Sequence, residues 1–212
     1  MARHSVRKYR NQPIEAEKAS KLQAAVDDVN RESGLHIQLV LNEPEAFSGF
    51  LAHYGAFSGC SNYFVLAGKP GLDEKVGYYG EKLVLEAQML GLNTCWVALT
   101  YKKSKARVTL SEGEKVYLVI ALGYGETQGK ARSSRAFEKV ASFEGECPAW
   151  FRSAVEAALT APTAVNQQKF HFTLDGSTVR AKAGFGTLTA LDLGIVKYHF
   201  EIGAAGQKFN WG

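Results

Sequence analysis

Two short segments of this chain hold residue types whose spacing suits chemistry. The first reads Arg3-His4-Ser5-Val6-Arg7 and places two guanidiniums, an imidazole and a hydroxyl just ahead of an expected helix. Guanidinium forks and hydroxyls match the geometry of phosphate oxygens, and a helix N-terminus adds free N–H groups and a favourable dipole. We therefore expect this segment to bind a phosphate group.

The second segment is a turn that starts with proline, and residues 161–168 read Ala-Pro-Thr-Ala-Val-Asn-Gln-Gln. It offers the Thr163 hydroxyl, the Asn166 amide and backbone N–H groups where a planar polar ligand could lie. Each segment alone has an ordinary explanation, a solvated chain end for the first and a simple turn for the second. Their occurrence in one chain favours a shared ligand site.

Composition limits the classes of function. The 212 residues are 46% hydrophobic and 22% charged, which is typical of one large globular domain or two small ones. The net charge of +4 comes without any run of more than two basic residues, so we expect no nucleic-acid or anionic-membrane partner. No apolar stretch approaches the roughly 20 residues of a membrane span, and no secretory signal is evident, so we expect a cytoplasmic protein.

Side chains that often carry catalysis or metals show no matching pattern. The odd cysteine count and the absence of a CxxC pair favour free thiols at Cys60, Cys95 and Cys147. The five histidines do not pair at ligand spacing, so we expect no metal site. No Ser/His/Asp set or carboxylate pair stands out, so we expect no catalytic acid, base or nucleophile from the protein.

Hydrophobic periodicity and turn residues predict the elements that position these segments. Helices are expected at 15–31, 73–90, about 148–159 and 191–205, with a possible short one at 44–54; strands are expected at 35–41, 63–67, 94–98, 116–122, 170–174 and 178–183. The glycines of residues 123–129 follow a strand but precede a basic loop rather than a helix, which excludes a Rossmann dinucleotide site.

Several stretches together resemble the nitroreductase family. They are the opening Arg3–Tyr9 motif, Gly77–Trp96 as the central helix and following strand, and Ala121–Gly125 with Arg135–Glu138 as the closing strand and basic loop. The resemblance implies an α+β, FMN-binding fold with antiparallel-rich sheets and central buried helices.

The chain departs from the family pattern in one respect. Ordinary members carry a Pro-Ser-x-x-Asn turn after the first helix and build the flavin site across a homodimer. Here that turn occurs only at Pro162–Asn166, and the Arg-x-Ser-x-Arg motif occurs only at the start. The chain therefore resembles a fused, degenerate dimer with an internal pseudo-twofold duplication. Its portions would be residues 1–140, with the phosphate-side motif, and residues 141–212, with the turn.

The resemblance also implies roles for individual residues. Arg3, Ser5 and Arg135 would hold the FMN phosphate with His4 beside them, and Arg132 and Lys130 would be helpers. Arg7 would lie at the N1–C2=O edge of the flavin, where a cation supports reduction. The cofactor-binding set that the resemblance implies is Arg3, His4, Ser5, Arg7, Ala98, Leu99, Arg135, Pro162, Thr163, Ala164 and Asn166.

The implied activity is an FMN-dependent oxidoreductase that passes a hydride from NAD(P)H to small planar electrophiles such as nitroaromatics or quinones. An ene-type or dehalogenating reductase belongs to the same class. The alternative is a flavin-binding storage or sensor module without turnover. We expect a monomer or weak homodimer with the site within one chain. Phe47, Phe50, Tyr54 and Phe57 either roof the site or belong to the core.

Overall fold

The computed structural model describes residues 3–212, apart from the side chain of Leu51. It divides into two compact units, and each is described separately. The N-terminal unit comprises residues 3–72 and 82–131, and the C-terminal unit comprises residues 73–81 and 132–212. Helix α3, Asp73–Met89, contributes its first half to the C-terminal unit and its second half to the N-terminal unit.

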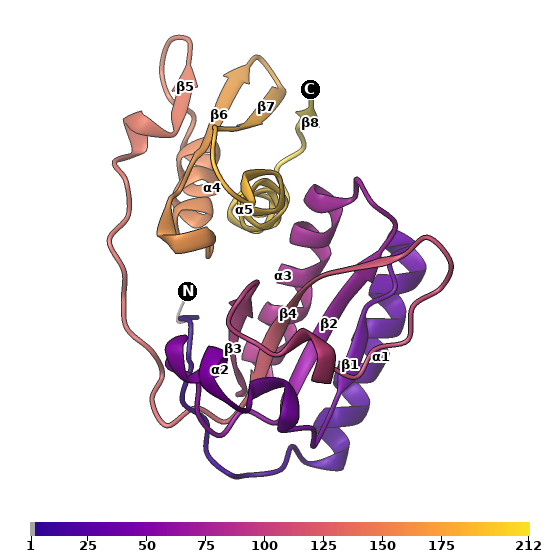
Figure 1. Cartoon of the computed structure of the whole chain (residues 1–212). Coiled ribbons are helices and arrows are strands. Elements are labelled where there is room, and N and C mark those ends of the chain that lie inside the picture. Colours follow the sequence, from indigo (N-terminus) through magenta and orange to yellow (C-terminus); the bar gives the residue numbers. More distant parts are fainter. Residues whose placement is uncertain (1–2) are drawn as a thin grey trace. The chain divides into compact units, whose positions relative to one another are not determined.

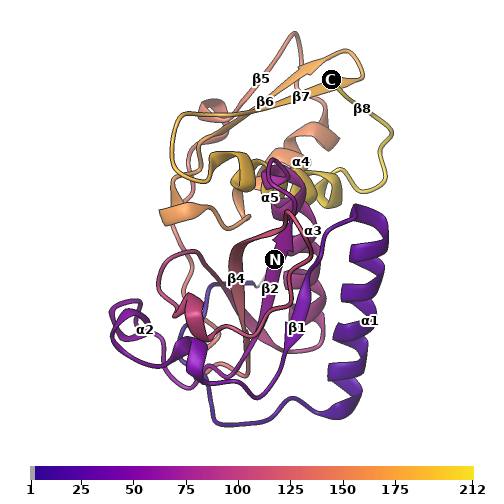
Figure 2. The same ribbon diagram turned by 45° about the vertical axis from the view of Figure 1, so that its right-hand side comes forward.

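The N-terminal unit is built on an antiparallel sheet of order β1-β2-β4-β3. Its strands are β1 (Gln38–Val40), β2 (Asn62–Gly68), β3 (Asn93–Val97) and β4 (Lys115–Gly123). Helix α1, Ala16–Ser33, lies beside β1 (Figures 1 and 2). Its buried side chains Leu22, Val26 and Val29 fall on one face, and Gly34 ends it in the left-handed conformation.

The other face of this sheet carries an aromatic core. Alternate side chains along β2 point to opposite faces of the sheet. Tyr63 and Val65 point away from α1 and pack in a cluster with Phe47 and Phe57. A 3-10 turn at Glu45–Phe47 and the short helix α2, Phe50–Tyr54, cover this cluster. Phe47 and Phe57 are therefore core residues, which decides the question that the sequence left open for them.

The C-terminal unit has a mixed sheet of order β5-β6-β7-β8. The strands are β5 (Ala141–Phe143), β6 (Phe170–Asp175), β7 (Thr178–Ala183) and β8 (Asn210–Trp211). β6 and β7 form the antiparallel hairpin expected from Asp175-Gly176, whereas β5 and β8 pair in parallel with their neighbours. Helices α4 (Ala149–Leu159) and α5 (Thr189–Gly203) pack together beside the hairpin (Figure 1).

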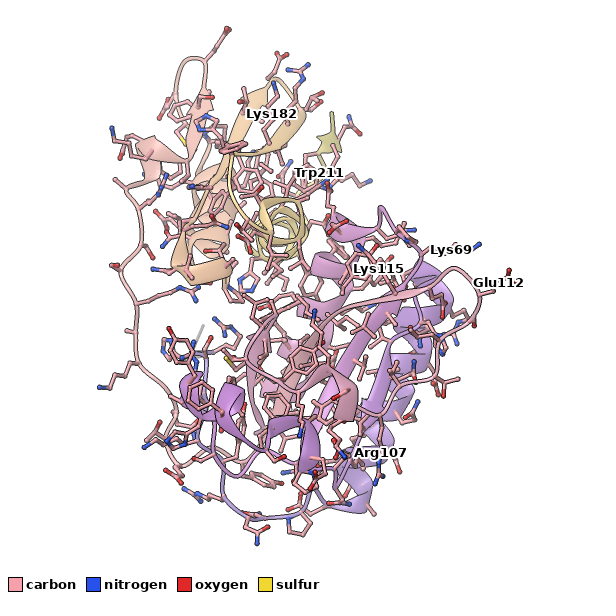
Figure 3. All side chains as sticks on the ribbon, in the orientation of Figure 1. Lys69, Arg107, Glu112, Lys115, Lys182 and Trp211 are labelled. Carbon is pink, nitrogen blue, oxygen red and sulfur yellow. The ribbon has the colours of Figure 1, made fainter. Side chains whose placement is uncertain are left out.

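Aromatic rings hold this unit together. The Phe200 ring contacts Phe172 and Trp211, with centroids 4.6 and 5.4 Å apart. The Trp211 indole N–H also donates to Glu201 at 2.8 Å, which fixes the chain end next to α5 (Figure 3). The Trp211 side chain of β8 packs in this aromatic core, which holds the short strand in place.

Two glycines allow α5 to cross the start of α3 at backbone contact. A Cβ on Gly77 would overlap the carbonyl oxygen of Leu191, and a Cβ on Gly194 would overlap the carbonyl oxygen of Glu74. The two contacts are reciprocal, because Leu191 lies three positions before Gly194 and Glu74 lies three positions before Gly77. No larger residue fits this crossing without moving a helix.

The structure confirms the expected mixture of helices and antiparallel sheets, while the duplication stays a prediction. The strand expected at 35–41 is shorter, because the Asn30 side chain pairs with both backbone polar groups of Ile37 at 2.8 Å. The sequence analysis missed β5 and β8, which are only three and two residues long. Remaining 3-10 turns lie at Lys103–Lys105, Phe137–Lys139 and Ala164–Asn166.

Candidate functional site

The opening motif lies along the edge strand of the N-terminal unit. Ser5 forms a parallel bridge with Thr94 of β3, and the Val6 N–H donates to the Thr94 carbonyl at 3.0 Å. Further along, the Tyr9 N–H donates to the Ser58 carbonyl at 2.9 Å, and the Ser58 N–H donates to the Arg7 carbonyl at 3.1 Å. Backbone hydrogen bonds therefore fix the register of the whole motif.

Three side chains of the opening motif, Arg3, Ser5 and Arg7, interact with the Cys95 thiol. Burial raises the pKa of the Cys95 thiol, and the charge of Arg7, a hydrogen bond with Ser5 and the charge of Arg3 oppose that rise. The Arg3 side chain is only 3% exposed, whereas Arg7 is exposed. A cationic cluster of this kind at a strand edge suits an anionic ligand.

Three other expected residues lie in the same unit. β3 ends at Val97, so Ala98 and Leu99 follow the last residue that pairs with β4. His4 lies against Gly129, where an added Cβ would come within 2.6 Å of the His4 Cβ. Arg3, His4, Ser5, Arg7, Ala98 and Leu99 thus all lie in the N-terminal unit, and we call this set the phosphate-side group.

The Pro-started turn lies in the C-terminal unit and has an unusual backbone. Val165, Asn166 and Gln168 have φ of +45°, +55° and +46°, in the left-handed region that few side chains adopt. Val165 is β-branched and its side chain is 98% exposed. Such conformations cost on the order of 1–3 kcal/mol each, so the rest of the unit must hold them in place.

Side-chain hydrogen bonds tie this turn to the basic loop at 132–135. The Asn166 and Gln168 amides both donate to the Ser133 carbonyl, at 3.0 and 2.9 Å. The Gln168 side-chain oxygen accepts the Arg135 N–H at 2.8 Å. The sequence analysis expected Arg135 with Arg3 and Ser5 on the phosphate side, whereas the structure places it beside the turn in the C-terminal unit, with its side chain exposed.

Three expected ligand-binding residues already have partners within the unit. The Asn166 amide is bound to Ser133, and Arg132 donates to the carbonyls of Thr160 and Ala161. The Thr163 hydroxyl also accepts the Gln168 N–H at 3.0 Å. These side chains hold the shape of the turn, and we call residues 162–168 with Arg135 the turn-side group. Lys130 belongs to the N-terminal unit and is exposed.

Sequence reasoning missed Asp192, which supports the turn from the first turn of α5. Its carboxylate accepts the Ala164 N–H at 2.9 Å and the Gln167 amide at 2.7 Å, and the residue is 3% exposed. Burial raises the pKa of Asp192 to about 6, although the hydrogen bonds with Gln167 and Ala164 act in the opposite direction. An aspartate within the otherwise apolar stretch Leu191–Val196 was the available signal.

Other features lie away from both groups. A cleft of about 840 Å³ runs between α1, β1 and residues 106–109, and none of the expected site residues lines it. Over residues 3–212, no three His, Cys, Asp or Glu side chains are placed to share a metal ion. No helix in that range has the length and apolar character needed to cross a bilayer.

The model of the family described as "Putative TM nitroreductase" matches residues 1–204 of this chain. This chain belongs to the nitroreductase family. No curated protein matches it.

Solved structures of nitroreductases share the fold. A Thermotoga maritima protein described as a putative nitroreductase superposes with a TM-score of 0.65 and 21% identity, over 95% of this chain and 80% of that one. An FMN-dependent nitroreductase from Clostridium difficile gives 0.51 and 19%, over 68% of this chain and 96% of its own. A nitroreductase family protein from Streptococcus pneumoniae gives 0.51 and 11%, over 66% and 94%.

Proposed function

We propose that this nitroreductase-family chain binds FMN and transfers reducing equivalents from NAD(P)H to small planar electrophiles such as nitroaromatics or quinones. The observation that carries the proposal is the phosphate-side group, in which Arg3, Ser5 and Arg7 gather at the edge of β3. The family model covers this group and the turn-side group alike.

The residues of both groups fit the chemistry of FMN. Arg3, His4 and Ser5 offer cationic and hydroxyl donors suited to the phosphate, and Arg135 has an exposed guanidinium suited to the same group. The backbone of Ala98 and Leu99, beyond the paired end of β3, would lie along the flavin ring. Pro162, Thr163, Ala164 and Asn166 would border the ring and ribityl chain from the turn.

The chemistry that FMN supplies when bound is the transfer of a hydride equivalent from NAD(P)H to an electron acceptor. Arg7 would hold a positive charge at the edge that gains negative charge on reduction, which stabilises the reduced form. The chain's other contributions would be binding, orientation and control of access. We therefore assign no proton-transferring residue.

A flavin storage or sensor module is the competing proposal, and one experiment separates the two. The purified protein should be yellow, with flavin bands near ~370 and ~450 nm. Addition of NADH or NADPH without oxygen should bleach the band at the longer wavelength within seconds, and a quinone should restore it. Bound flavin that neither nucleotide bleaches would favour the storage module, and protein that takes up no FMN would contradict both.

The site would form within one chain, as a fused dimer implies. The reciprocal contacts of Gly77 and Gly194 support an internal pseudo-twofold, because each lies against the residue three positions before the other. The stoichiometry should then approach one FMN per chain.

A mixing experiment tests the fused dimer. Protein carrying Arg3→Ala and Ser5→Ala is combined with protein carrying Pro162→Gly and Asn166→Ala, under conditions that allow subunit exchange. A site within one chain predicts that flavin binding stays lost. Recovery of about half of the sites in the mixed dimers would instead place the phosphate-side and turn-side groups on different chains.

A further inference from the structure

The turn that would border the flavin is strained, and its own sequence does not explain why it keeps its shape. Three of its residues adopt left-handed backbone conformations, and the exposed Val165 gains no packing in return. The N–H groups of Asn166 and Gln167 donate within the turn, to Thr163 and Ala164 at 2.9 Å. These bonds and that of the Gln168 N–H to the Thr163 hydroxyl hold part of the shape, and further support comes from outside the turn.

Asp192 supplies two such bonds from a single buried carboxylate. One oxygen accepts the Ala164 N–H, immediately before Val165, and the other accepts the Gln167 amide, two residues after it. The Gln167 amide uses its second hydrogen on the Thr187 carbonyl at 2.8 Å, so it links the turn to the loop before α5. The carboxylate thus holds the strained residues from both sides.

We propose that Asp192 is a positioning residue that keeps the turn at 163–167 in the conformation that receives the flavin. This inference rests on the proposed function, because it assumes that the turn meets FMN. It assigns Asp192 no contact with the ligand. The carboxylate acts only through Ala164 and Gln167.

The position of Asp192 is unfavourable for stability, which gives the proposal a distinctive test. The pKa of Asp192 is raised to about 6, above the ordinary value near 4 for an aspartate. Its protonated form therefore stabilises the fold below about pH 4, and this stabilisation is lost as the pH rises through 6. At pH 8 the buried carboxylate is ionised, so Asp192 contributes less to stability there than at pH 4.

The surroundings of Asp192 add little other charge. The turn at 163–168 and the loop at 184–188 carry no ionisable side chain. The charged groups on the adjoining elements have partners of their own. Glu74 pairs with Lys197, and Lys169 donates to the Phe185 carbonyl. Arg132 donates to the Thr160 and Ala161 carbonyls, and Lys75 also has a partner.

The test compares Asp192→Asn with wild type at pH 8. Asparagine keeps an acceptor for the Ala164 N–H but cannot accept from the Gln167 amide without loss of another bond. We expect the FMN dissociation constant to rise about tenfold. We expect the melting temperature of the FMN-free variant, relative to that of wild type, to increase between pH 4 and pH 8, because the wild-type carboxyl ionises over that range and the asparagine does not. Asp175→Asn, an exposed carboxylate in the same unit, should change neither quantity.

A second variant covers the case in which Asp192→Asn fails to fold. Gln167→Ala removes one bond to the carboxylate without altering charge, and should weaken FMN binding severalfold. FMN affinities in both variants equal to that of wild type, or an affinity loss in Asp175→Asn as large as in Asp192→Asn, would overturn the positioning role. Wild-type protein that binds no FMN would contradict the proposed function instead, so the two failures are distinct.

Discussion

The two groups of expected ligand-binding residues are held in opposite ways. The opening motif of the phosphate-side group is held at the edge of a sheet by backbone hydrogen bonds, such as that from the Val6 N–H to the Thr94 carbonyl. The turn-side group depends on side chains, since Asp192 and Gln168 make the bonds that fix a strained backbone. Backbone hydrogen bonds tolerate most side-chain substitutions, whereas substitution of a few side chains can disrupt the turn.

Under the proposed function, the difference follows from what each group would bind. A phosphate needs several donors around a small anion, and a segment laid along a strand delivers side chains at a fixed spacing. A planar ring needs backbone groups that lie in the plane of the ring and open space next to them. A regular strand does not offer this arrangement. The left-handed residues Val165 and Asn166 bend the chain away from such a path.

The largest effect should come from the helix crossing that supports only the turn side. Gly194→Ala places a Cβ into the Glu74 carbonyl, and Gly77→Ala places one into the Leu191 carbonyl. Each should lower the free energy of unfolding by about 4 kcal/mol or more, since the contact is backbone to backbone. Thermal unfolding measures it, with the exposed Ile202→Ala as the control. A mild effect of either glycine variant would contradict the close crossing.

The contrast between side-chain and backbone support is tested by Gln168→Ala against Tyr9→Phe. The Gln168 side chain makes three hydrogen bonds, so its loss should cost roughly 2–3 kcal/mol and open the loop at 132–135 to proteases. Tyr9→Phe removes a single bond to the Val6 carbonyl at 2.7 Å and should cost only about 1 kcal/mol. Denaturant unfolding and limited proteolysis measure both, and a reversed order would break the comparison.

The phosphate assignment is sharpened by Arg3→Ala. Loss of a charged contact of roughly 1.5–3 kcal/mol should weaken FMN at least about tenfold and leave riboflavin nearly unaffected. Isothermal titration of both flavins provides the measurement, and Arg10→Ala, an exposed arginine next to the motif, is the matched control. An equal loss of affinity for FMN and riboflavin would contradict the assignment of Arg3 to the phosphate.

The smallest effect concerns Arg7, whose charge is expected at the ring. Arg7→Met should lower the flavin reduction potential by about 30 mV, equivalent to about 1.4 kcal/mol for two electrons, and largely spare FMN affinity. A redox titration against a reference dye checks this. An unchanged potential would assign Arg7 to the phosphate or to solvent.

The sequence by itself determined the local elements and the family. Leu22, Val26 and Val29 recur at helical spacing, and Gly34 ends that helix, because these signals act within a few residues. The Asp175-Gly176 pair likewise fixed a hairpin. The opening motif and the turn were recognisable because their residue types carry their chemistry.

Only the tertiary structure decided which polar side chains are engaged. Asn166 and Thr163 read as ligand contacts in the sequence, yet their partners are Ser133 and the Gln168 backbone. Asp192 reads as a single charge in the apolar stretch Leu191–Val196, and its bonding depends on a turn that lies about 25 residues earlier in the chain. Hydrogen bonds between distant segments leave no periodicity in a sequence, because any polar residue at the right point in space can make them.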